Sequence, residues 1–143
     1  MTDSDVSSIK KSQEMSLVTH SKLVKVEKKC KLFLENDRIK FLGVINNLGN
    51  LIAGDFQNGF QPVGTSEIRK MMFMQLKLDL NMRKDYDELF GPVSYVISKR
   101  RDVEKISIPV GSYMVLLITE LNFEIAKIEN IISTFKSIID DFT

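Results

Sequence analysis

The spacing of hydrophobic residues predicts an amphipathic helix near the start of the chain. From Leu17 to Asn36, apolar residues recur every three or four positions, and lysines occupy most of the remaining surface. This pattern is typical of a helix with one buried stripe. The stripe consists of Leu23, Val26, Cys30 and Phe33.

Two short runs of strand-forming residues follow and predict a hairpin. The runs are residues 39–46 and 51–56, and the sequence between them is Asn-Leu-Gly-Asn. Asn and Gly readily adopt the positive φ angles that a tight turn requires. The first run is apolar on both of its faces, so we expect it in the centre of a sheet that is covered on both sides.

A long helix, three strands and a final helix are predicted after the hairpin. Thr65 or Ser66 can cap the long helix, and the Gly-Pro pair at residues 91–92 ends it. Three strand-like runs joined by tight connections then indicate an antiparallel meander. The runs are residues 93–101, 103–110 and 113–119. Asn122 is expected to cap the final helix, which carries one apolar stripe. That stripe consists of Ile125, Ile128, Ile132, Phe135, Ile139 and Phe142.

The order of these elements indicates an α/β fold of the α+β kind. The two most apolar strands are the first and the last along the chain. If they pair side by side, the result is a five-stranded antiparallel sheet of order 2-1-5-4-3 with the topology α-β-β-α-β-β-β-α. We expect the first and last helices to cover one face of this sheet and the long helix to cover the other.

Residues 43–53, Gly-Val-Ile-Asn-Asn-Leu-Gly-Asn-Leu-Ile-Ala, resemble the opening hairpin of the roadblock and profilin-like (longin-related) superfamily. Residues 39–132 also resemble an uncharacterised family of archaeal proteins. The roadblock resemblance implies a homodimer that serves as a scaffold or regulator, often around small GTPases, with no catalytic residues to carry over. The Lys-rich first helix and the residues before it do not match the family pattern.

The long helix has more apolar circumference than one sheet face can cover. Its polar residues form a narrow stripe, whereas a helix packed on one sheet needs an apolar stripe of roughly 100°. We therefore expect a second apolar partner, which could be a second copy of the chain, the terminal helices of the same chain, or a cofactor. We favour a dimer seam made by this helix and the edge strand at residues 93–101. The polar stripe consists of Lys70, Lys77, Asn81, Lys84 and Glu88. The expected interface residues are Met71, Met74, Leu78, Met82, Arg83, Tyr95 and Ile97.

Two groups of charged residues are candidates for contacts with a partner. Asp79, Arg83 and Asp87 follow one another at intervals of four, so Arg83 can reach a carboxylate on either side, either as an interface ladder or as an exposed rim. Lys99, Arg100 and Arg101 end an edge strand and form a candidate basic patch for phosphate or an acidic partner. No aromatic platform is expected beside this patch, so specific nucleic-acid binding is not predicted.

The amino-acid composition argues against several classes of function. The 143 residues include 20 Lys and Arg against 19 Asp and Glu, a balance that gives no general attraction to nucleic acid or anionic membranes. With His20 as the single histidine and Cys30 as the single cysteine, a metal cluster, a disulfide or a paired nucleophile is not expected. No glycine-rich phosphate loop opens a helix. We therefore predict neither an enzyme nor a metal or other cofactor.

Residues 1–15 are polar and are predicted to form a flexible tail, and residues 16–143 are predicted to form a single domain. No apolar run approaches the roughly 20 residues that cross a bilayer, and a lone cysteine fits a reducing compartment. A cytoplasmic location is therefore predicted.

The alternative function is a PAS-like small-molecule sensor with a ligand held between the sheet and a helix. Aromatic side chains could line such a cavity, but a ligand site also needs convergent polar groups. The candidate aromatic residues are Phe41, Phe56, Phe73, Tyr95 and Tyr113. The candidate polar residues are Ser94, Ser98 and Ser107.

Overall fold

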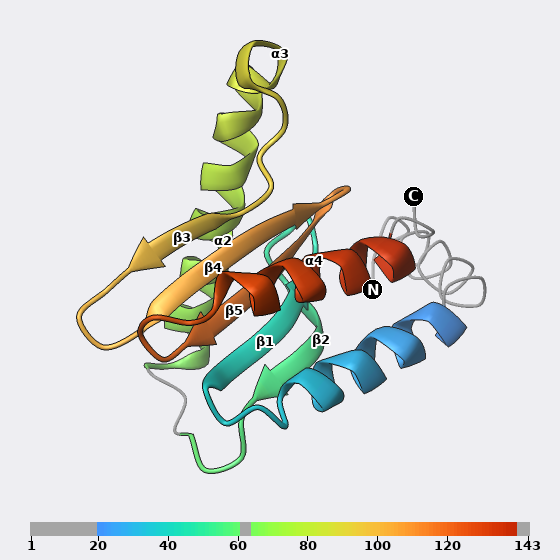
Figure 1. The fold of residues 1–143 in the computed structure, drawn as a ribbon, viewed down its shortest axis with the longest axis vertical. Coiled ribbons are helices and arrows are strands. Elements are labelled where there is room, and N and C mark those ends of the chain that lie inside the picture. Colours follow the sequence, from blue (N-terminus) through green and yellow to red (C-terminus); the bar gives the residue numbers. More distant parts are fainter. Residues whose placement is uncertain (1–19, 61–63, 140–143) are drawn as a thin grey trace, which may run out of the picture.

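A computed structural model describes residues 20–60 and 64–139 as a sheet with helices on both faces (Figure 1). The expected flexible tail at residues 1–15 lies outside the described residues. Every pair of neighbouring strands is antiparallel, in the order β2-β1-β5-β4-β3, which confirms the predicted sheet. The strands are β1 (Ile39–Ile45), β2 (Leu51–Phe56), β3 (Val96–Lys99), β4 (Glu104–Val110) and β5 (Tyr113–Thr119).

The first helix (residues 20–33) and α4 (Ile125–Ile139) cover one face of the sheet, and α2 (Ser66–Arg83) covers the other (Figure 1). The predicted long helix is interrupted after α2 by a 3-10 turn, η1 (Lys84–Tyr86), and a short helix, α3 (Asp87–Phe90). These two segments project beyond the end of the sheet (Figure 1). Sheet packing therefore no longer supports the regular helix there.

The core under the first helix and α4 contains the predicted stripe of the first helix. Val26 and Cys30 are fully buried, and Phe33 packs partly buried beside them. On the strands, Leu42, Val44, Val115 and Leu117 point into this core and are also fully buried. β1 and β5 have an apolar core on each side because they lie in the centre of the sheet.

Helix α4 differs in two respects from its prediction. Its buried residues are Ile128, Ile131, Phe135 and Ile139, whereas Ile125 is 56% exposed and Ile132 is half-buried. Ile125 is the first residue of the helix and lies at the margin of its buried side. Asn122 is not the cap, because it adopts a left-handed backbone (φ 61°) and its side-chain oxygen lies 3.4 Å from Lys99 Nζ. Phe142 lies outside the described residues.

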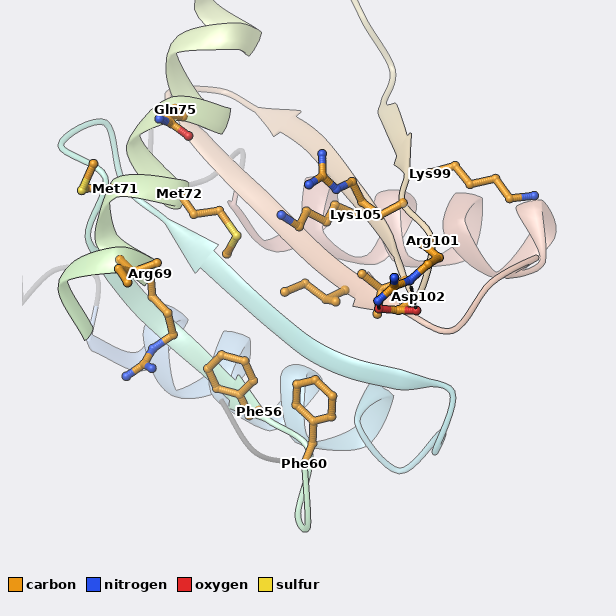
Figure 2. Close-up of a pocket in the computed structure, with 14 residues that line it drawn as sticks. Phe56, Phe60, Arg69, Met71, Met72, Gln75, Lys99, Arg101, Asp102 and Lys105 are labelled. Carbon is orange, nitrogen blue, oxygen red and sulfur yellow. Dashed lines mark hydrogen bonds and ion pairs between the residues drawn. The ribbon is translucent and has the colours of Figure 1, made fainter. Parts of the chain in front are cut away.

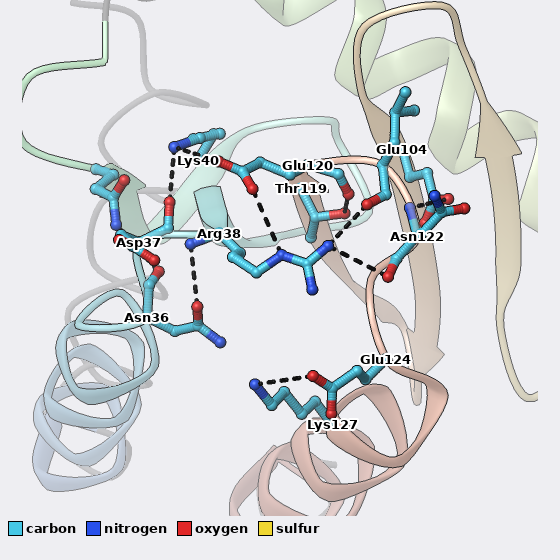
Figure 3. A network of polar contacts seen from close by, with 12 residues as sticks. Asn36, Asp37, Arg38, Lys40, Glu104, Thr119, Glu120, Asn122, Glu124 and Lys127 are labelled. Atoms are coloured by element: carbon cyan, nitrogen blue, oxygen red, sulfur yellow. Dashed lines mark hydrogen bonds and ion pairs between the residues drawn. The ribbon is translucent and has the colours of Figure 1, made fainter.

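Polar side chains hold the loop before α4 at the end of the sheet (Figure 3). The guanidinium of Arg38 donates to the Leu121 carbonyl at 2.7 Å and lies 3.5 Å from a Glu120 carboxylate oxygen. The buried Glu104 carboxylate accepts a hydrogen bond from the backbone N–H of Asn122 at 2.9 Å. These contacts fix where α4 starts relative to β1 and β4.

The two edge strands of the sheet differ in the hydrogen bonds that they make with the rest of the chain. At β2, the amide of Gly54 donates to Glu27 of the first helix at 2.9 Å. The side-chain amide of Gln57, just after β2, donates to the carbonyls of Leu34 and Asn36. By contrast, no residue in the described part of the chain hydrogen-bonds to the outer edge of β3. The open edge of the sheet is therefore β3.

The core between α2 and the sheet contains a charged residue that the prediction put on the exposed side. Phe73 and Leu80 face the sheet, and Lys77 lies between them with only 3% of its surface exposed. The predicted polar stripe is therefore wrong at Lys77. The methylene stem of a lysine can pack against apolar surface while its ammonium reaches a polar group, and here Lys77 Nζ lies 3.3 Å from Asn81 Oδ1.

We expect Lys77→Met to raise the free energy of unfolding by about 1 kcal/mol at pH 7, because a buried ammonium with one hydrogen bond is replaced by an apolar chain of similar length. Burial, and secondarily Lys84, lower the pKa of Lys77 from 10.5. The unfolded chain thus keeps this proton to higher pH than the folded chain, so the cost of the charge is full below the folded pKa and is lost as the pH rises from the folded pKa to 10.5.

Urea unfolding of Lys77→Met and the wild type at pH 7 and pH 10 measures this effect. The difference between the two proteins should shrink at the higher pH. Lys70→Met is the control, since Lys70 is exposed on the same helix and should change the stability little. A loss of stability in Lys77→Met at pH 7 would show that the buried ammonium is favourable where it lies.

Candidate interaction surfaces

The side of α2 that faces away from the sheet carries exposed apolar residues from its first turn to its last. The buried residues Phe73 and Leu80 occupy one side of the helix, and exposed apolar residues recur every three or four positions on the opposite side. The stripe continues past η1 onto α3, where Phe90 is 84% exposed. We call this the outward stripe of α2. It consists of Ile68, Met71, Met74, Leu78, Met82, Tyr86, Leu89 and Phe90.

The structure excludes one of the three expected partners for the outward stripe. The first helix and α4 lie on the opposite face of the sheet, so the terminal helices of the same chain do not cover it (Figure 1). Met74 packs over the β1–β2 turn, where a Cβ atom at Gly49 would come within 2.5 Å of the Met74 sulfur. Apart from this contact, the stripe faces outward. Exposed apolar surface of this extent is typical of a site that contacts another molecule.

The edge strand that was expected beside this helix is shorter than predicted. β3 spans Val96–Lys99 instead of residues 93–101. Continuing the β3–β4 register would pair Ser94 with Pro109, which has no N–H group to donate. Tyr95 is half-buried against the core under the first helix and α4, and Ile97 is 39% exposed. These two residues of the predicted interface therefore border the open edge and are not part of the outward stripe.

The predicted Asp79–Arg83–Asp87 series forms only one ion pair among the residues that the structure describes. Arg83 Nε lies 3.0 Å from Asp79 Oδ2, and both side chains are about half exposed. Asp87 lies beyond the 3-10 turn, so the helical spacing that would bring it to Arg83 is broken. Its buried Oδ1 has no hydrogen-bond partner in the described residues. The observed pair is an exposed rim contact, which contributes at most about 1 kcal/mol.

The candidate basic patch lines a groove of about 880 Å³ between the first half of α2 and the β3–β4 turn (Figure 2). Lys99, Arg100 and Arg101 are all exposed there. Phe56 and Phe60 line the opposite side of the same groove (Figure 2). The expectation that no aromatic residue accompanies the patch is therefore wrong. Arg69 of α2 and Lys105 of β4 also line the groove, and neither is expected there from the sequence.

The aromatic residues proposed for a PAS-like ligand site do not surround one cavity. Phe41 and Phe73 stack with their ring centroids 5.7 Å apart in the core under α2. Tyr95 and Tyr113 pack against the core on the other face of the sheet. The sheet therefore separates the two halves of the proposed lining.

Two further observations concern metal binding and the single cysteine. They contain no group of three His, Cys, Asp or Glu side chains placed to hold a metal ion. Cys30 is buried, and this burial together with the nearby Glu27 raises the pKa of its thiol to about 12, so it stays protonated near neutral pH. Within residues 20–60 and 64–139, no helix is long and apolar enough to cross a bilayer.

Comparisons with known proteins agree with this architecture. A family model described as "Family of unknown function (DUF6659)" matches residues 19–143, and none of the curated proteins matches the sequence. Among solved structures, Myxococcus xanthus MglB is similar with a TM-score of 0.64 and 13% identity, over 85% of this chain and 92% of that one. A structure described as MglB with tetrameric arrangement has a TM-score of 0.63 and 9% identity, over 86% of this chain and 91% of that one. A Roadblock/LC7 domain from Streptomyces avermitilis has a TM-score of 0.57 and 6% identity, over 73% of this chain and 85% of that one.

At these identities the similarity establishes the fold and nothing finer. The chain has a roadblock-like fold, which confirms the resemblance seen in the β1–β2 hairpin. None of these matches bears on the expected archaeal relatives, so that expectation stays a prediction.

Proposed function

We propose that this chain, which belongs to the DUF6659 family, is a homodimer-forming interaction module that serves as a scaffold or regulator. The observation that carries the proposal is the outward stripe of α2. Its members include Leu78 at 55% and Met82 at 70% exposure, on the side of the helix opposite the buried face. A helix that is apolar on two opposite sides needs a second partner.

A second copy of the chain is the partner that fits both the outward stripe and the open edge. In a two-fold assembly each subunit contributes the same patch, so one α2 helix packs on another and one β3 edge faces another. Edge strands with unpaired backbone groups pair readily with another strand. Such an assembly would join two five-stranded sheets into one, with Tyr95 and Ile97 beside the junction.

The chemistry of the stripe favours an interface that can adapt to its partner. Three of its residues are methionines, Met71, Met74 and Met82, whose flexible thioether side chains fill irregular gaps. Arg83 and Asp79 lie at its margin, where an ion pair would help to fix the register of two helices. We include all of these residues in the seam.

The further partner in this proposal is a small GTPase or another regulatory protein. This part rests on the roadblock resemblance and on the roadblock-like fold of the chain. A non-catalytic role in the cytoplasm belongs to the same proposal. A PAS-like sensor is not proposed, because the aromatic residues it requires are divided between the two cores.

The mass of the wild-type protein in solution tests the proposal directly. Light scattering at about 20 µM should give twice the 16.4 kDa of one chain, since one well-packed seam of this kind is stable at micromolar concentrations. A wild-type monomer at tens of micromolar would contradict it.

A further inference from the structure

The groove beside the β3–β4 turn combines an apolar floor with positively charged walls (Figure 2). It lies between the first half of α2 and the end of the sheet, and its volume of about 880 Å³ is in the range of ligand sites. The apolar residues that line it include Phe56, Phe60, Met72, Val103 and Ile118. The cationic residues are Arg69, Lys99, Arg100, Arg101 and Lys105.

The positive charge of this groove is not balanced from within the described part of the chain. Asp102 is the one carboxylate that lines the groove, and Arg101 already engages it through two hydrogen bonds of 3.0 and 3.1 Å. The side chains of Arg100 and Lys105 make no ion pair or hydrogen bond with any described residue. The whole chain is nearly neutral, with 20 basic and 19 acidic residues, so this excess is local.

Lys105 is a cation of the groove that is not fully exposed. It projects from β4 and is partly buried. Burial and, to a smaller degree, the charge of Arg100 lower the pKa of its ammonium. A positive group held in this way, next to a second cation, is stabilised when a negative group enters.

The aromatic residues of the groove are arranged for packing and not for stacking on nucleobases. The Phe56 ring already contacts Phe41 at a centroid distance of 4.7 Å and Phe60 at 5.9 Å. The guanidinium of Arg69 lies 5.8 Å from the centre of the same ring. Single-stranded nucleic acid binds through exposed ring faces, which Phe56 does not offer. A membrane surface is also a poor fit, because the charges line a concave groove.

We propose that this groove binds a segment of a partner protein in which carboxylates alternate with apolar side chains. The apolar residues of the segment would pack on Phe56, Met72 and Ile118, and its carboxylates would pair with Arg100 and Lys105. This inference rests on the proposed role as an interaction module and names the chemistry of the partner. The groove is separate from most of the outward stripe and shares with it only Ile68 and Met71.

Fluorescence anisotropy with full-length protein at 150 mM salt tests the inference. The probe is a labelled 12-residue peptide in which Glu alternates with Leu or Phe. Arg100→Glu/Lys105→Glu should weaken binding at least tenfold, because two charge pairs become repulsive. Lys28→Glu/Lys29→Glu changes the net charge equally on the exposed side of the first helix and should change binding less than twofold.

Peptide controls keep the test valid even if a charge-reversed protein folds poorly. Replacing each Glu of the probe by Lys should abolish binding to the wild type, and replacing each Leu and Phe by Ser should weaken it at least tenfold. Circular dichroism checks the fold, and Lys105→Gln provides a milder variant with an intermediate affinity.

Several outcomes would overturn the inference. These are equal weakening by the two double variants, equal affinity for the Ser-substituted peptide, and tighter binding of a 12-nucleotide single strand or of phosphatidylserine vesicles than of the probe. Light scattering separates this result from the proposed dimer. A dimeric wild type that does not bind the probe refutes the groove assignment alone, whereas a monomer that binds it refutes the dimer alone.

Discussion

Leu78→Glu is expected to convert the protein from a dimer to a monomer without unfolding it. The side chain is 55% exposed in the single chain, so a glutamate there remains in water when the subunits are apart. Within the proposed seam, each copy loses a buried leucine worth about 1.5–3 kcal/mol. The two-fold axis doubles this loss to about 3–6 kcal/mol, which corresponds to a rise of about 10² to 10⁴ in the dimer dissociation constant.

Leu32→Glu is the matched control for this experiment. Leu32 is 54% exposed, nearly the same as Leu78, but it lies on the first helix and thus on the other face of the sheet. Sedimentation equilibrium of both variants and the wild type from 1 to 100 µM gives the dissociation constants, and circular dichroism verifies folding. The seam lies elsewhere if folded Leu78→Glu stays dimeric, or if Leu32→Glu dissociates equally.

Gly54→Ala is expected to lower the free energy of unfolding by about 3 kcal/mol or more, a loss typical of severe backbone and packing damage. Gly54 has φ 99° and lies opposite Gly43 in the β1–β2 pair. A Cβ atom at Gly54 would overlap the carbonyl oxygen of Leu42 and lie 2.6 Å from the Cα atom of Gly43. Both neighbours are backbone of the central strand, so neither can move without disturbing the sheet.

Thermal unfolding by circular dichroism measures the size of this effect. For a protein of this length, 1 kcal/mol corresponds to about 2–4 °C, so the midpoint should fall by about 6–12 °C. Gly59→Ala is the control, since Gly59 has a similar φ of 83° but no atom within 4 Å of an added Cβ. It should lose only about 1 kcal/mol, from backbone strain. Equal losses in the two variants would mean that close approach at Gly54 is unimportant.

The order of the strands could be predicted because the central strands carry a signal in their composition. β1 and β5 are apolar on both faces, since each lies between two cores, and this property predicts central positions for both, where they pair with each other. The turn at Gly49 and the cap at Thr65 were also readable, because each depends on neighbouring residues. Local chemistry and central burial are therefore the parts of this fold that a sequence reveals.

The orientation of α2 was only partly predictable, because the helix is apolar on two sides. A helical wheel orders its residues around the axis, but it does not say which apolar side meets the sheet. The polar stripe predicted from the helical wheel therefore includes Lys77, although this residue lies between Phe73 and Leu80 in the core. The residue at which β3 begins depends on Pro109 in the facing strand. This pairing can be recognised only when the register of the two strands is known.

The groove could not be predicted, because its walls come from distant parts of the chain. Phe56 belongs to β2, Arg69 to α2 and Lys105 to β4, and no periodic pattern in the sequence links these positions. The basic run at residues 99–101 was the one visible signal. Its aromatic neighbours were hidden because β2 and β3 form opposite edges of the sheet.

In the proposed dimer, the unequal edges of the sheet would limit the size of the assembly. The β2 edge is closed in part, because the Gly54 amide donates to Glu27 of the first helix, and β3 is open. When two copies join through β3, the resulting ten-stranded sheet ends on both sides in a closed β2, so strand addition stops after one step. In that dimer the first helix would act as a terminator of polymerisation. A sheet with two open edges would grow into a fibre, whereas the proposed assembly would be self-limiting.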